Sequence, residues 1–305
     1  KIWKINLTPK GEAINIIGGG LAATKSTIFV TTGYGDVFAI DSKDGKIIWN
    51  KKLKVPLRGA PTVAGEKIFF LSVDNKVFAL DINSGLSLWM NGTVAESISI
   101  LGGGSPAYFD GIVVVPYTSG DLVALNAESG SVIWVENLIR GKARLNLSQL
   151  NDANSKPVID NGILYAIGSG GKMISVDLQT GNRFWSKELG GKSSPWIGGN
   201  FLFTITHQNQ LVAISKDDGM IRWINQLPRF FNEKKQEKKV LWNGPILASD
   251  RLLSVSSSGL VLSISPYTGK ILGEVKISSG TFIESIIADR TFLVLSNDGK
   301  LSAFR

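Results

Sequence analysis

The chain has 305 residues, 43% of them hydrophobic, with a net charge of +8, one histidine and no cysteine. This composition excludes disulfides, thiolate metal sites and sites built on several histidines, and it supplies enough apolar residues for a sizeable core. No apolar run reaches the roughly 18 residues that cross a bilayer as a helix.

The first predicted elements are a strand over residues 1–7 and a strand–turn–strand unit over 35–49. Within this unit, residues 37–40 form an apolar run of strand length, residues 41–45 are turn formers, and β-branched and aromatic residues follow up to Trp49. A turn of this length needs a residue with positive φ, which Gly45 adopts at little cost.

The same unit returns along the whole chain as an internal repeat. Its turn glycines are separated by 40, 45, 51, 38 and 50 residues, and they are Gly45, Gly85, Gly130, Gly181, Gly219 and Gly269. A tryptophan follows four residues after each glycine except the last, where Gly273 takes its place. A seventh copy starts at residue 299 and stops before its turn. This period is typical of architectures built from one four-stranded unit per repeat.

Two further strands are predicted upstream of each unit. One is a second apolar run, as at 28–30 and 68–70, and most repeats place a small residue, a proline and a short strand before it, as at 60–62 and 105–107. Small residues and proline suit an inner strand near a crowded axis. Four strands per repeat, arranged radially, make a β-propeller.

We therefore predict an all-β fold, a single β-propeller domain over residues 1–305 with four-stranded antiparallel blades. Six complete repeats and one composite blade give seven blades. In the composite blade, the strand at 1–7 pairs with the strand at 299–304, which closes the ring and removes its exposed edges. Because the chain opens inside a strand, we expect any signal peptide or anchor to lie outside this sequence.

Patterns that carry catalytic chemistry are few. His207 has no acidic cluster with ligand spacing around it. The glycine-rich stretch 168–172 does not lie between a strand and a helix, and its lysine is not followed by Ser or Thr as the nucleotide-binding motif requires, so we interpret it as a turn with close backbone contacts. The repeated acids mark turns: Asp41, Asp81 and Asp177. Function is therefore expected where the repeats differ.

Of three interruptions of the repeat, two are candidates for a binding site. The stretch 97–106 places Ile98 and Ile100 at strand alternation, and 140–154 lies in the longest repeat. Each is interpreted either as a binding loop on a rigid scaffold or as a loop tucked over the mouth of the propeller. The third, 229–239, has two aromatic residues ahead of a run of charged residues. An exposed, solvated loop is the favoured interpretation, and attraction to an anionic partner or membrane face is the alternative. Scattered positive charge disfavours nucleic-acid binding.

The recurring core, Φ-x-A-Φ-D-x-x-x-G-x-x-x-W, resembles the repeat of pyrroloquinoline-quinone-type propellers over the whole chain. Within that superfamily the chain resembles the BamB family, propeller lipoproteins of the bacterial outer-membrane β-barrel assembly machinery. The residues that carry this resemblance are 97–102 ahead of Ser105-Pro106, 150–154 ahead of Pro157, and 298–305.

The resemblance implies a scaffold with no catalytic residue, metal or cofactor, whose two loops bind the periplasmic POTRA region of a BamA-like outer-membrane protein. The partner-binding residues carried over are Ile98, Ile100, Leu101, Asp152 and Asn154. Leu101 stands where the family has Arg, and Asn154 where it has a second Asp. These two changes affect a salt bridge to the partner, whereas the apolar contacts are expected to persist.

The resemblance also implies a periplasmic protein at the outer membrane, with any lipid anchor outside this sequence, and we expect a monomer. The family usually has eight blades, against the seven predicted here. Two alternatives come from other classes: a quinoprotein dehydrogenase, or a propeller that binds a small ligand at its mouth. The dehydrogenase resemblance implies a calcium site and typically a vicinal disulfide, which a chain without cysteine cannot form.

Overall fold

A computed structural model describes residues 3–9, 11, 19–92, 104–139, 155–191, 193–281, 284–288, 290–298 and 300–305. Every regular element in this part of the chain is a β-strand, which agrees with the predicted all-β fold. Among these residues, no helix has the length and apolar character needed to cross a membrane. Contacts divide the chain into two compact units, and the division runs through the fourth sheet.

The first unit contains three complete four-stranded antiparallel sheets. Their strands are β1 (Gly19–Ala23), β2 (Thr27–Thr32), β3 (Asp36–Asp41) and β4 (Ile47–Lys52); β5 (Thr62–Ala64), β6 (Lys67–Leu71), β7 (Lys76–Asp81) and β8 (Ser87–Gly92); β9 (Ala107–Phe109), β10 (Ile112–Pro116), β11 (Asp121–Asn126) and β12 (Val132–Asn137). The fourth sheet consists of β13 (Val158–Asp160), β14 (Ile163–Ile167), β15 (Met173–Asp177) and β16 (Arg183–Lys187).

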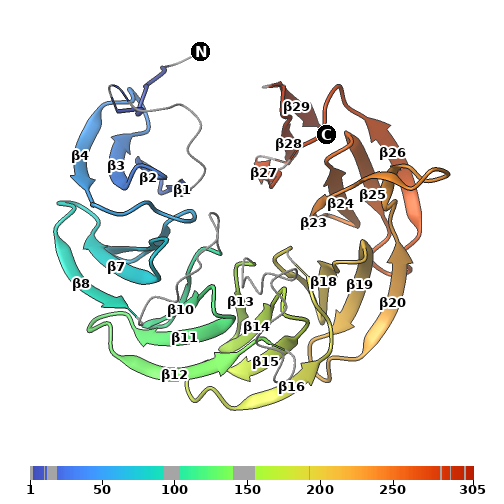
Figure 1. Cartoon of the computed structure of the whole chain (residues 1–305), viewed down its shortest axis with the longest axis horizontal. Helices are drawn as coiled ribbons and strands as arrows, with labels where there is room; N and C mark the ends of the chain where they lie inside the picture. The colour runs from blue at the N-terminus through green and yellow to red at the C-terminus, as the bar shows by residue number, and fades with distance from the viewer. Residues whose placement is uncertain are drawn as a thin grey trace. The chain divides into compact units, whose positions relative to one another are not determined.

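The second unit contains two complete four-stranded sheets, a two-stranded hairpin and a three-stranded sheet. Their strands are β17 (Trp196–Gly198), β18 (Phe201–Ile205), β19 (Gln210–Ser215) and β20 (Ile221–Gln226); β21 (Phe230–Asn232) and β22 (Glu237–Lys239); β23 (Trp242–Ala248), β24 (Arg251–Ser256), β25 (Leu260–Ile264) and β26 (Ile271–Lys276); β27 (Ile286–Ala288), β28 (Thr291–Leu295) and β29 (Leu301–Phe304). Each four-stranded sheet follows sequence order (Figure 1), which is the strand order of a propeller blade.

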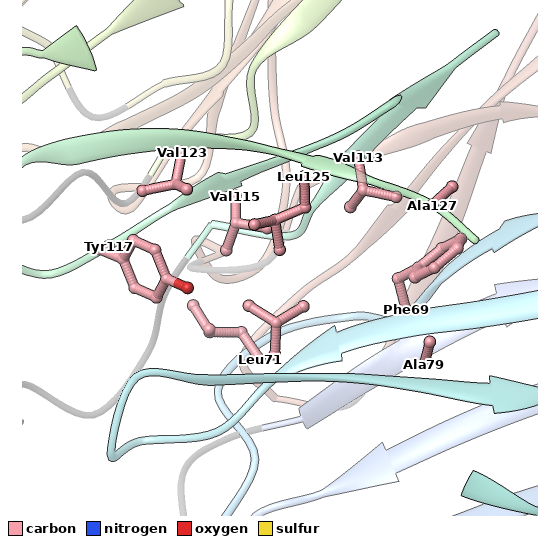
Figure 2. Packing of buried hydrophobic residues seen from close by; sticks show 10 residues of the cluster. Phe69, Leu71, Ala79, Val113, Val115, Tyr117, Val123, Leu125 and Ala127 are labelled. Atoms are coloured by element: carbon pink, nitrogen blue, oxygen red, sulfur yellow. The ribbon is translucent and has the colours of Figure 1, made fainter. Parts of the chain in front are cut away.

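The hydrophobic core lies between neighbouring sheets. In the first unit, side chains from β6 and β7 pack against side chains from β10, β11 and the residues just after them (Figure 2): Phe69, Leu71, Val77 and Ala79 face Val113, Val115, Tyr117, Val123, Leu125 and Ala127. Among the residues that the structure describes, the Tyr117 hydroxyl has no hydrogen-bond partner, and burial raises the pKa of Tyr117 to about 12. Contacts between sheets therefore hold this unit together.

The repeated tryptophan joins each sheet to the next. Trp49 Nε1 on β4 donates to Ile82 O at 3.0 Å, and the Trp49 ring covers Gly85, where an added Cβ would lie 2.7 Å from the ring. Gly85 has a φ of +68°, as the turn prediction requires. We call this arrangement the tryptophan clamp. Five others have the same donor and a backbone acceptor: Trp3 to Ser42, Trp89 to Ala127, Trp134 to Leu178, Trp185 to Lys216 and Trp223 to Pro266.

The alanine of the motif faces the tryptophan across the third and fourth strands. Ala39 pairs with Trp49, and Ala79 with Trp89, and a register shift follows each alanine. A small residue here leaves room beside the indole. In the copy without a tryptophan, Ser263 pairs with Gly273, so the alanine and the tryptophan are replaced together.

Closure of the ring by the N- and C-terminal strands stays a prediction. Among the described residues, 3–9 pair with no strand, and the last sheet has the three strands β27–β29. Trp3 nevertheless makes a tryptophan clamp on the first sheet, with 3.0 Å from Nε1 to Ser42 O and its ring over Gly45. Residue 3 thus behaves like the tryptophan of an outer strand.

Candidate functional site

The five predicted partner-binding residues all lie outside the described residues. Ile98, Ile100 and Leu101 belong to segment 93–103, and Asp152 and Asn154 belong to segment 140–154. The site is therefore built here from the described residues at both ends of each segment.

The two segments end on neighbouring strands of the first unit. Segment 93–103 runs from β8 to β9, and segment 140–154 runs from β12 to β13. Strand β9 contacts both β5 and β13. The repeat explains this placement, because each segment links the last strand of one sheet to the first strand of the next. Sequence-distant residues at the ends of both segments are thereby brought together.

The chain just after segment 93–103 is held by buried residues. Gly104 and Pro106 are buried, and Pro106 O accepts a hydrogen bond from Thr62 Oγ1 on β5 at 2.5 Å. At the start, Asn91 Nδ2 on β8 donates to Gly130 O at 2.5 Å. The described residues on both sides of segment 93–103 are thus tied to a neighbouring sheet.

The residues just before segment 140–154 pack against the glycine-rich stretch 168–172. Leu138 is buried, and its N–H donates to Gly120 O at 2.9 Å. A Cβ added to Gly168 would lie 2.6 Å from Leu138 Cβ, and one added to Gly170 would lie 3.0 Å from Ile139 Cα. The interpretation of these glycines as close backbone contacts is confirmed. Because Gly168 and Gly170 have no side chains, they leave room for Leu138 and Ile139.

One contributor to this region was missed in the sequence. Arg58, which precedes β5, is only 2% exposed, and its Nη1 donates to Asn75 Oδ1 at 3.3 Å. Asn75 Nδ2 in turn donates to Thr118 Oγ1 at 2.9 Å. This network connects the first, second and third sheets, because Gly19 N also donates to Arg58 O at 3.3 Å. The one sequence feature that could have indicated this network is the charged residue directly before Gly59-Ala60-Pro61.

The repeated aspartates in the described part of the chain hold turns. Asp81 Oδ1 accepts hydrogen bonds from Ser84 Oγ at 2.6 Å and from Ser84 N at 2.7 Å, which lowers the pKa of Asp81. Asp177 accepts from Thr180 in the same way, and its pKa is lowered too. Among the described residues, no three His, Cys, Asp or Glu side chains gather as metal ligands would. The assignment of these acids to turns is confirmed.

Comparison with known proteins first identifies the class. The structure matches the crystal structure of BamB from Moraxella catarrhalis with a TM-score of 0.83 and 21% identity, covering 94% of this chain and 84% of that one. It matches a quinohemoprotein alcohol dehydrogenase from Comamonas testosteroni with a TM-score of 0.60 and 12% identity, covering 91% and 70%. Likeness at these identities shows the fold, a β-propeller. In the described part of the chain, six four-stranded sheets and one three-stranded sheet agree with the seven predicted blades.

Sequence comparison then identifies the family. The family described as "Outer membrane protein assembly factor BamB" matches residues 1–225, and the chain belongs to it. A relative of that name from Yersinia pestis is 21% identical over 100% of this chain and 77% of its own length. One from Salmonella typhimurium is 24% identical, covering 99% and 76%.

Proposed function

We propose that this protein is a non-catalytic scaffold in outer-membrane protein assembly, acting in the periplasm at the outer membrane. Support comes from its family and from relatives across its whole length that are named as assembly factors. The repeat agrees with this role, because its distinctive residues are used for turns and tryptophan clamps. A propeller held together in this way presents segments between blades on a rigid support.

The partner is the POTRA region of a BamA-like outer-membrane protein, and segments 93–103 and 140–154 bind it. The observation that carries this proposal is that the two segments end on β9 and β13, which contact one another. Ile98, Ile100 and Leu101 supply an apolar centre, and Asp152 and Asn154 supply a polar rim. Interfaces of this kind take most of their binding energy from a few central residues.

The test is a calorimetric titration of the protein with the soluble POTRA region. Ile100→Asp places a charge in the apolar centre, and we expect it to weaken binding by about 30-fold or more, as at an interface hot spot. Ile48→Asp is the matched control, because Ile48 on β4 is 53% exposed and lies outside both segments. It should bind like the unaltered protein.

Two results would contradict the proposal. Unchanged affinity in Ile100→Asp, with the fold intact by circular dichroism, would remove segment 93–103 from the site. Absence of binding by the unaltered protein would remove the POTRA region as the partner.

A further inference from the structure

The insertion at 229–239 forms a β-hairpin, where an exposed flexible loop was the favoured interpretation. Strands β21 and β22 pair through Phe230 with Lys239 and through Asn232 with Glu237. All residues from 231 to 239 are exposed. The hairpin, drawn in orange in Figure 1, extends away from the sheets of the second unit. Its side chains are therefore available to a partner.

Hydrogen bonds at the base and within the hairpin hold its shape. Trp242 Nε1 donates to Pro228 O at 2.8 Å, and Asn209 Nδ2 donates to Val240 O at 2.9 Å. Glu233 Oε1 accepts from the backbone N–H groups of Arg229 and Phe230 at 2.5 and 2.9 Å. One of the two carboxylates is thus used by the backbone, and the lysines remain available for an external anion.

The hairpin combines free cations with exposed apolar side chains. Residues 229–239 contain five cations and two carboxylates, a net charge of +3. In the described part of the chain no salt bridge involves any of its four lysines, which are Lys234, Lys235, Lys238 and Lys239. Beside them, Phe231 is 52% exposed and Leu241 is 56% exposed. Lysines next to an exposed aromatic are typical of segments that lie in a membrane interface.

We propose that the hairpin 229–239, with the adjacent Leu241, binds the surface of an anionic lipid bilayer. The lysines contact headgroup phosphates, and Phe231 enters the boundary between headgroups and acyl chains. A bilayer fits better than an acidic protein, because a stable protein interface needs about 800 Å² from each partner, more than strands of three residues offer. The inference does not rest on the proposed function.

The experiment is flotation of the protein with vesicles. We expect binding to vesicles of phosphatidylcholine mixed with phosphatidylglycerol, weaker binding at higher salt, and little binding to phosphatidylcholine alone. A variant with all four hairpin lysines changed to Gln should bind at least about 100-fold more weakly, since each lysine near a charged bilayer contributes about fivefold. Phe231→Ser should weaken binding about tenfold and leave its salt dependence in place.

A second lysine variant separates the hairpin from the net charge of the protein. It removes the same number of exposed lysines elsewhere, and these are Lys25, Lys43, Lys54 and Lys270. This variant should keep most of the binding, and thermal melting should show all variants folded. Equal loss in the two lysine variants would overturn the proposal. So would equal binding to both kinds of vesicle, or binding to neither, which would leave an acidic protein as the partner class.

Discussion

At the residue scale, the tryptophan clamp depends on two small residues that are distant from it in the sequence. Trp49 faces Ala39 across β3 and β4, and its ring covers Gly85 of the following sheet. Burial of a large apolar side chain contributes about 1.5–3 kcal/mol, and a hydrogen bond such as that from Trp49 Nε1 adds about 1 kcal/mol. Six clamps of this kind make the contacts between sheets a major source of stability.

Substitution of Gly85 tests the clamp directly. Gly85→Ala places a methyl group 2.7 Å from the Trp49 ring at a φ of +68°. Backbone strain at residue 85 and displacement of the indole ring therefore both destabilise the fold. We expect it to lower the free energy of unfolding by about 2–4 kcal/mol. The control is Gly65→Ala, where φ is +56° and no atom lies within 4 Å, and it should cost about 1 kcal/mol. Urea denaturation measures both values; equal losses would show that the ring contact is unimportant.

At the element scale, the turn between the third and fourth strands uses a side-chain oxygen to hold its backbone. Asp81 and Asp177 do this with carboxylates, and Asn126 does it with an amide oxygen that accepts from Glu128 N and Ser129 N, each at 2.9 Å. The hydrogen bonds lower the pKa of both aspartates below the ordinary value of 3.8. Only the aspartate turns therefore lose hydrogen bonds on protonation.

This difference predicts a pH dependence. The folded-state pKa values of Asp81 and Asp177 are depressed, so their contribution to stability is present above pH 3.8 and is lost as the pH falls through the folded values. The double variant Asp81→Asn and Asp177→Asn should show a flatter decline of the urea midpoint below about pH 5. The matched control is Asp217→Asn, because Asp217 is exposed in the corresponding turn between β19 and β20 and, among the described residues, its carboxylate accepts no hydrogen bond; the original slope should be kept. An unchanged slope in the double variant would contradict this role.

The strands of the blades could be predicted because every repeat carries the same residue pattern. Copies in which this pattern is weak can be aligned on copies in which it is strong. The hairpin of β21 and β22 could not, since 229–239 has no copy elsewhere and no apolar alternation. Its shape depends on Glu233 accepting backbone N–H groups and on positive φ values at Gln236 and Lys238. Both features belong to the folded hairpin and leave no pattern in the sequence.

The candidate site was predicted in part for the same reason. Ile98 and Ile100 stand out because they interrupt the repeat, whereas the specific partner came from a resemblance. The seating of Leu138 on Gly168 and the burial of Arg58 depend on residues from different sheets, so neither could be derived from spacing. Sequence reasoning therefore located the segments but not the contacts that fix their ends.

At the scale of the whole molecule, the two proposed binding surfaces belong to different units. Segments 93–103 and 140–154 extend from strands of the first unit, and the cationic hairpin extends from the second. Partner binding and lipid binding are therefore expected to respond to different substitutions. The four-lysine hairpin variant should bind the POTRA region normally, and Ile100→Asp should float with anionic vesicles normally.

The most direct test of the central claim is recovery of the partner from intact cells. A tagged copy of the protein, crosslinked in the cell envelope and purified, should recover the BamA-like protein as its principal partner. Ile100→Asp should reduce that recovery, and Ile48→Asp should not. Recovery of the BamA-like protein at the level of an untagged control would contradict the account.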